Sequence, residues 1–195
     1  MIVNNLKIKK MKNIITLLIL IAITISCKAQ IIAVENFEDY PNELPDGAYI
    51  KDVNNVLGKY VGTWKGTYNN KNYDFKIVKY TENNIDLKYK EDMLLIRYKI
   101  TDSSGTELAN TLSLPNSSPY IIFGRYLAKS GGYVLNYQGL NAKCGQNGRI
   151  YISTYGANDT KLQLLLMVSG EIYDECTTGA VPQIMPTTSM ELIKQ

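Results

Sequence analysis

Alternation of apolar and polar residues with a period of two constrains the fold of this chain more than any other feature. Such runs recur along most of the sequence, and one of them alternates Tyr73, Phe75 and Ile77 with Asp74 and Lys76. Successive side chains of a β-strand point to opposite faces, so these runs predict antiparallel strands with one buried face. Because no amphipathic helix longer than a turn or two is visible, we expect an all-β domain.

Turn-forming clusters separate the strand-like runs at nearly even spacing. Examples are YNNKN at 68–72, DSSG at 102–105 and KSGG at 129–132. The pattern predicts an antiparallel meander of about 8–10 strands that folds as a barrel or a sandwich, and a last strand that pairs with an early one closes it as a barrel. We expect strands at roughly 60–68, 72–80, 84–90, 93–101, 107–113, 119–127, 132–138, 149–155, 161–170 and 187–194.

Residues 1–26 have the composition of a secretory signal peptide. Four lysines precede a continuous apolar run from Ile14 to Ile25, and the segment has no acidic residue. This is the pattern of an export signal, and the run is shorter than the roughly 20 residues of a membrane span. We therefore expect an exported protein. MKNIITLLILIAITISC is a complete signal by itself, so both Met1 and Met11 are candidate starts.

Two modes of processing fit the end of this signal. TISC, residues 24–27, resembles a bacterial lipobox, in which Cys27 is lipidated and becomes the N-terminal residue. In the alternative, an ordinary signal peptidase cleaves after Ala29. We favour the lipobox, which predicts a protein of the periplasm or outer membrane that meets the membrane only through its lipid anchor.

The charge of the chain does not indicate a nucleic-acid partner. The formal net charge is +3, from 21 basic and 18 acidic residues, but four of the basic residues belong to the signal peptide. Without them the protein is close to neutral, and it lacks the basic excess that nucleic-acid binding requires.

Two cysteines, Cys144 and Cys176, remain for the folded domain under either mode of processing. In an exported protein such a pair predicts a structural disulfide. The alternative is a thiolate site for catalysis or metal binding, which needs partner side chains. Since the chain contains no histidine, we favour the disulfide.

The absence of histidine also removes the commonest general base and the commonest metal ligand. Adjacent acidic residues occur at 38–39, 91–92 and 174–175, and a pair of carboxylates suffices for glycoside hydrolysis. Neighbouring residues of a strand point to opposite faces, however, and adjacent acids in loops are usually solvated. We predict no catalytic residue, no metal and no cofactor, with a carboxylate-dependent glycosidase as an alternative.

The only tryptophan, Trp64, lies in the motif Gly62-Thr63-Trp64 at the start of the predicted domain, residues 56–195. An extended lead-in, residues 27–55, precedes it, and Asp52 is placed to cap a short helical turn. GTW, the helical lead-in and the meander resemble lipocalin-like (calycin-like) barrels. The stretch DGAYIKDVNNVLGKYVGTWKG also resembles a family of uncharacterised exported bacterial proteins. The resemblance implies that Trp64 packs at a closed barrel end under a basic residue of the last strand, here Lys194.

Fifteen tyrosines leave two interpretations open. They suit half-buried strand positions, or they form a surface or barrel mouth that binds a ligand. The leading hypothesis is a non-enzymatic binding or interaction module for a small apolar ligand, a glycan or an envelope protein. The alternative is a structural or assembly partner of an envelope complex.

Overall fold

The computed structural model describes residues 30–40 and 44–195. The predicted signal peptide and Cys27 lie outside the described residues. Residues 31–195 form one compact unit. This unit is all-β, with 50% of the residues in strands and 7% in helices, as the sequence predicted.

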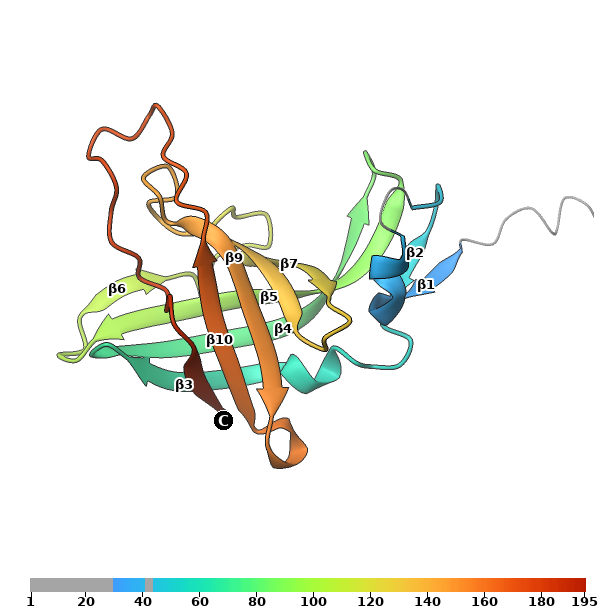
Figure 1. Cartoon of the computed structure of the whole chain (residues 1–195), viewed down its shortest axis with the longest axis horizontal. Helices are drawn as coiled ribbons and strands as arrows, with labels where there is room; N and C mark the ends of the chain where they lie inside the picture. The colour runs from blue at the N-terminus through green and yellow to red at the C-terminus, as the bar shows by residue number, and fades with distance from the viewer. Residues whose placement is uncertain (1–29, 41–43) are drawn as a thin grey trace, which may run out of the picture. The chain divides into compact units, whose positions relative to one another are not determined.

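Eight antiparallel strands form a closed barrel (Figure 1). Their order is β5-β4-β3-β11-β10-β9-β8-β7, and β7 pairs back with β5 to close the sheet on itself. The predicted lipocalin-like barrel is therefore confirmed. The barrel strands are β3 (Gly62–Tyr68), β4 (Lys71–Asn84), β5 (Tyr89–Asp102), β7 (Ile122–Leu127), β8 (Tyr133–Gln138), β9 (Asn147–Tyr155), β10 (Lys161–Val168) and β11 (Met190–Lys194).

The strand predicted at 84–90 is wrong. Residues 85–88 form the turn that joins β4 to β5, and these two strands are 14 residues long each. Asn84 makes the turn by accepting a hydrogen bond from the Leu87 amide at 3.1 Å, and Lys88 adopts a left-handed φ of 54°. In the sequence, Ile85 and Leu87 alternate with Asp86 and Lys88 as they would in a strand, but both aliphatic side chains are exposed.

The lead-in is more structured than an extended segment. It contains β1 (Ile31–Ala33), the 3-10 helix η1 (Val34–Asp39) and β2 (Tyr49–Lys51), and η2 (Gly58–Tyr60) follows. β1 pairs in parallel with β2, and β2 pairs in parallel with β5, so the lead-in extends the barrel sheet. Two further elements are β6 (Glu107–Asn110), which also pairs with β5, and η3 (Ala157–Asp159).

A buried polar network fixes the lead-in to β4 and β5. Asp92 accepts hydrogen bonds from Thr81 Oγ1 at 2.7 Å, the Tyr49 hydroxyl at 2.9 Å and the Asp52 amide at 3.1 Å. Burial raises the pKa of Asp92, but these hydrogen bonds outweigh it and hold the pKa below its usual value. Asp52 forms an ion pair with Lys79 at 3.1 Å, and its carboxylate oxygens lie 3.4 Å from the Leu57 amide. The predicted capping role is wrong, because the 3-10 helix begins at Gly58 with Leu57 as its N-cap and no side chain of the described residues caps it. Asp52 instead contacts the backbone just before this helix.

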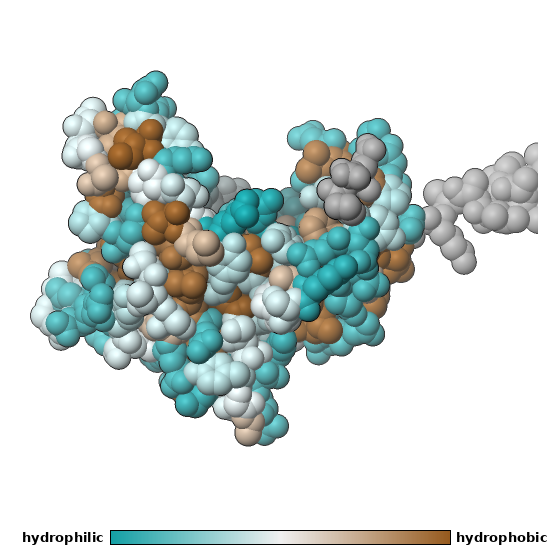
Figure 2. Space-filling model, viewed as in Figure 1, coloured by the Kyte–Doolittle hydropathy of each residue, from teal (hydrophilic) through white to brown (hydrophobic). Residues whose placement is uncertain are grey.

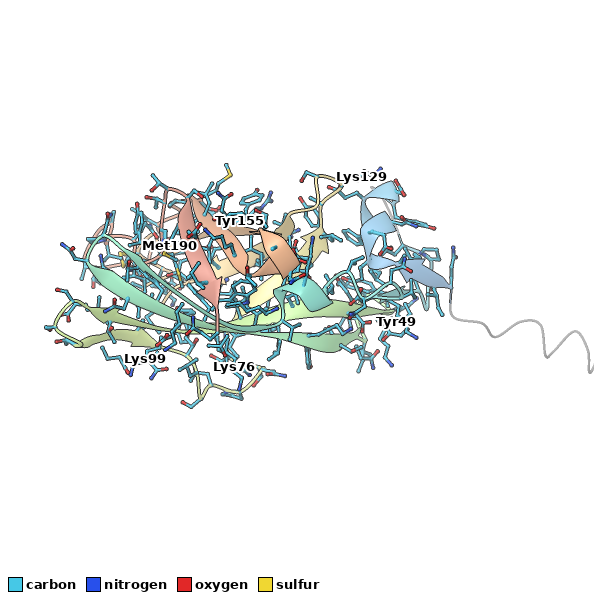
Figure 3. The ribbon with its side chains drawn as sticks, turned by 90° about the horizontal axis from the view of Figure 1, so that it is seen from below. Tyr49, Lys76, Lys99, Lys129, Tyr155 and Met190 are labelled. Atoms are coloured by element: carbon cyan, nitrogen blue, oxygen red, sulfur yellow. A yellow bond between two sulfur atoms is a disulfide. The ribbon has the colours of Figure 1, made fainter. Side chains whose placement is uncertain are left out.

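Side chains fill the inside of the barrel. Buried apolar residues from all eight barrel strands belong to one core cluster, which includes Trp64, Phe75 and Tyr98. The charged residues that alternate with them lie outside, as Figure 3 shows for Lys76 and Lys99 on the outer side of β4 and β5. A small second cluster covers that outer side around Met93, Leu95 and Ile121. A ligand site is therefore to be sought at the barrel ends or on the outer surface.

Candidate functional site

The strand register gives the barrel two distinct ends. One end, where β3 begins and β11 finishes, holds Trp64 and is called the tryptophan end. At the other, called the disulfide end, β8 and β10 finish and β9 begins. It carries the loop 139–146 and the segment 169–189, which we call the strap.

At the tryptophan end, Gly62, Trp64 and Lys194 form one packed cluster. Trp64 is fully buried, and its Nε1 donates a hydrogen bond to the Tyr60 carbonyl at 2.8 Å. Lys194 Nζ lies 5.1 Å from the Trp64 ring centroid and donates to the Lys59 carbonyl at 3.3 Å. Gly62 has a φ of 140°, and a Cβ there would lie 3.1 Å from Lys194 Cε, so glycine leaves room for the lysine. The cluster satisfies its own polar groups, which suits an architectural role.

At the disulfide end, Cys144 and Cys176 form the predicted disulfide, with their Cα atoms 5.2 Å apart. The bond ties loop 139–146 to the strap. Backbone hydrogen bonds reinforce the connection, from the Val181 amide to the Cys144 carbonyl at 3.0 Å and from the Tyr173 amide to the Lys143 carbonyl at 2.9 Å.

The strap also packs onto the barrel. Met185 is buried in the core, and the neighbouring Ile184 carbonyl accepts a hydrogen bond from the Tyr73 hydroxyl at 2.8 Å. Gln146 Nε2 donates to the Pro182 carbonyl at 2.7 Å. These contacts hold the strap across the end of the barrel in a defined position.

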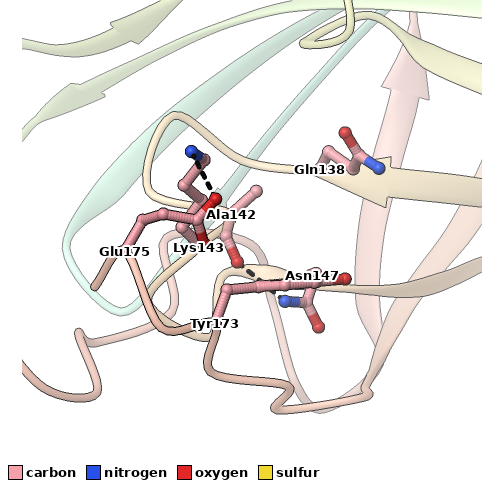
Figure 4. Close-up of a pocket in the computed structure, with 6 residues that line it drawn as sticks. All are labelled: Gln138, Ala142, Lys143, Asn147, Tyr173 and Glu175. Atoms are coloured by element: carbon pink, nitrogen blue, oxygen red, sulfur yellow. Dashed lines mark hydrogen bonds and ion pairs between the residues drawn. The ribbon is translucent and has the colours of Figure 1, made fainter.

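A pocket of about 290 Å³ lies between loop 139–146 and the first half of the strap (Figure 4). On its rim, Lys143 Nζ forms an ion pair with Glu175 at 3.2 Å, and the Tyr173 side chain is about half exposed. The volume is near the lower limit for small-molecule sites. This disulfide pocket is lined by Gln138, Ala142, Lys143, Asn147, Tyr173 and Glu175.

Asn147 is the most constrained polar group of the pocket. Its Nδ2 donates hydrogen bonds to the Ala142 carbonyl at 2.8 Å and to the Glu171 carbonyl at 2.9 Å, which fixes the orientation of the amide. Its Oδ1 is buried and accepts no hydrogen bond from the part of the chain that the structure describes. A buried acceptor without a donor costs about 1–3 kcal/mol, so a donor that reaches this Oδ1 atom from the neighbouring pocket would stabilise the protein.

Further buried polar atoms gather near the disulfide end. The hydroxyls of Tyr98 and Tyr137 interact with each other, and the Oε1 atom of Gln183 in the strap has no partner among the described residues. A Cβ on Gly139 would lie 2.5 Å from the Tyr137 hydroxyl, so this hydroxyl points to loop 139–146. Burial raises the pKa of Tyr98 to about 12 and also raises that of Tyr137, so both hydroxyls stay neutral.

A profile of a protein family of unknown function, DUF6705, matches residues 11–168. The chain belongs to this family. The matched region contains the lead-in, the GTW motif and the barrel strands from β3 to β10, so the resemblance to an uncharacterised family is confirmed. No curated protein and no solved structure matches the chain. Within residues 30–40 and 44–195, no helix is long and apolar enough to cross a membrane.

In each acidic pair of this DUF6705 protein at least one carboxylate is engaged in a structural contact. Asp39 pairs with Lys129, whose amide also donates to Glu38, while Glu175 pairs with Lys143 and is the only carboxylate of the disulfide pocket. Asp92 belongs to the lead-in network. Among the described residues, no group of three or more acidic or cysteine side chains is placed to hold a metal ion.

Glu91 belongs to one of the acidic pairs named from the sequence, but its burial was not predicted. It is buried on β5, and burial raises its pKa to about 7. Arg125 on β7 opposes the shift, whereas the neighbouring charges of Asp92 and Glu82 reinforce it. Glu82 lies directly opposite Glu91 across the β4–β5 ladder, where like charges destabilise each other.

Proposed function

We propose that this DUF6705 protein is an exported, lipid-anchored, non-enzymatic binding module whose ligand occupies the disulfide pocket. The observation that carries the proposal is the Asn147 amide, which is fixed in orientation and keeps a buried acceptor beside a pocket. The packed core of the barrel supports the choice of a site at its end. The family and its barrel fold are compatible with a binding role.

The chemistry of the pocket favours a neutral, hydroxyl-rich ligand such as the end of a glycan. Lys143 and Glu175 neutralise each other, so the pocket holds no unpaired charge to select an ion. The exposed ring of Tyr173 provides a flat apolar surface, and the amide groups of Gln138 and Asn147 provide polar contacts. A sugar ring combines an apolar face with hydroxyls that both donate and accept hydrogen bonds.

We expect ligand-observed NMR with a panel of neutral oligosaccharides to show binding, and Tyr173→Ala to weaken the best ligand about tenfold. A central aromatic contact is worth more than 1 kcal/mol in many binding sites, which corresponds to such a factor. Tyr120→Ala is the matched control, because Tyr120 is also a half-exposed tyrosine but lies outside the pocket. A panel without any bound sugar, or equal weakening by both variants, would contradict the proposal.

Export and anchoring rest on the signal-like segment and the lipobox-like TISC sequence. We expect a fatty-acid probe fed to the producing bacterium to label the wild-type protein and not Cys27→Ala. The substitution removes the thiol to which the lipid is attached, and it leaves Cys144 and Cys176 paired. Gel fluorescence of the purified proteins measures the label. Equal labelling of both proteins, or of neither, would reject the lipobox.

A further inference from the structure

Beyond the barrel, β4 and β5 continue as a two-stranded arm at the tryptophan end. β3 pairs with β4 only as far as Ile77, and β7 pairs with β5 only at Leu95 and Ile96. Residues 78–84 and 89–94 therefore extend past both neighbouring barrel strands. β2 and β1 line the arm, which Figure 1 shows at the upper right.

The tip of the arm carries aliphatic side chains that nothing in the described unit covers. Ile85 is 79% exposed and Leu87 is 63% exposed, the two largest values among the exposed large hydrophobic residues. Ile31 at the start of β1 is 57% exposed. Its register partner Tyr49 pairs with Lys90, so the starts of β1, β2 and β5 lie side by side next to the tip. Figure 2 shows hydrophobic surface on this part of the molecule.

The tip is held in this form by hydrogen bonds. The Lys88 amide donates to the Ile85 carbonyl at 3.3 Å, and the Gly47 amide donates to the Lys88 carbonyl at 2.7 Å. Lys88 Nζ pairs with Asp46 at 3.0 Å. Because the turn is fixed to the loop before β2, its two aliphatic side chains are presented to the outside as a rigid pair.

The position of the predicted anchor indicates what covers this pair. Cys27 precedes Ile31 by four residues, and four residues of chain span at most about 14 Å. A lipid on Cys27 therefore holds the bilayer surface close to the start of β1, which is beside the tip of the arm. This step rests on the anchor in the proposed function.

We propose that the arm is a membrane-docking element that places Ile85 and Leu87 in the interfacial region of the bilayer. Burial of aliphatic side chains is favourable in proportion to the apolar area removed from water, so two partly inserted residues give a weak but measurable affinity. Lys88 is paired with Asp46, and Lys90 Nζ lies 5.4 Å from the Tyr49 ring centroid. Asp86 lies between the two aliphatic residues and is exposed, so the turn also carries a negative charge. Docking therefore depends on the two apolar side chains and does not require anionic lipid. With the arm on the bilayer, the disulfide pocket lies at the opposite end of the barrel.

The test uses the non-acylated Cys27→Ala chain from residue 27 onward and sedimentation with zwitterionic phosphatidylcholine vesicles. We expect measurable partitioning that Ile85→Ser/Leu87→Ser reduces about tenfold. Met167→Ser/Ile172→Ser is the matched control, because it removes two residues of 58% and 54% exposure at the disulfide end. Absence of vesicle binding by the parent chain, or equal loss in both double variants, overturns the proposal and favours a protein partner at the tip.

A second measurement reports the contact directly. An environment-sensitive fluorophore on Leu87→Cys is expected to shift to the blue when vesicles are added, and the same label on Ile172→Cys is not. Both tests are independent of acylation. If the fatty-acid probe does not label the protein but vesicle binding persists, the anchor is rejected and the docking arm is retained. If the fatty-acid probe labels the protein but the fluorophore at position 87 shows no blue shift, only the docking arm is rejected.

Discussion

Replacing Trp64 with alanine is expected to lower the free energy of unfolding by about 4 kcal/mol. The side chain is fully buried in the core, and substitution of such an aromatic residue by alanine costs about 3–5 kcal/mol. The variant also loses the hydrogen bond to the Tyr60 carbonyl and the ring beneath Lys194. Because the protein has no other tryptophan, urea unfolding is best followed by far-ultraviolet circular dichroism.

Lys194→Met provides the control for this experiment. It keeps an apolar side chain over the ring and removes the ammonium group, so we expect a loss of only about 1 kcal/mol. Folded Lys194→Met is expected to bind ligand at the disulfide pocket as the wild type does. A cost below 1 kcal/mol for Trp64→Ala would show that the tryptophan is not a core residue, and loss of binding in Lys194→Met would move the site to the tryptophan end.

The barrel could be predicted from the sequence because each barrel strand has one face in the core. The alternation of Leu162, Leu164 and Leu166 with polar or half-exposed neighbours reports this directly. The short strands β1 and β2 could not be found in the same way, because each has only three residues in the sheet, β1 in parallel with β2 and β2 in parallel with β5. The turn at 85–88 was wrongly predicted as a strand because Ile85 and Leu87 alternate with polar residues, although both side chains are exposed.

The sequence predicted less of the candidate site than of the fold. The predicted disulfide between Cys144 and Cys176 is confirmed, and it joins loop 139–146 to the strap. The pocket between them depends on where Asn147 and Tyr173 stand relative to each other, and they are 26 positions apart in the chain without a motif that links them. The fixed amide of Asn147 follows from backbone carbonyls of two different loops, which no residue pattern encodes.

Glu91 illustrates a further effect of burial, because its raised pKa makes the stability of the protein depend on pH. Its carboxyl group binds a proton more tightly in the folded chain, with a pKa of about 7, than in the unfolded chain, where the pKa has its ordinary value of 4.5. Between these two values the folded state holds more protons than the unfolded state, so this group makes stability fall as pH rises. The loss is complete above pH 7 and amounts to about 3 kcal/mol. Asp92 acts in the opposite direction, since its lowered pKa removes stability as pH falls.

Glu91→Gln isolates this contribution, because glutamine has the shape of the protonated acid and cannot ionise. We expect the variant to match the wild type at pH 4 and to exceed it by about 3 kcal/mol at pH 8, measured by urea unfolding at each pH. Glu107→Gln is the matched control, since Glu107 forms an exposed ion pair with Lys99 and its removal is worth less than about 1 kcal/mol. A difference between Glu91→Gln and the wild type that stays constant with pH would mean that Glu91 ionises as freely in the folded protein as in the unfolded chain. In that case Arg125 would lower the pKa of Glu91 by as much as burial, Glu82 and Asp92 together raise it.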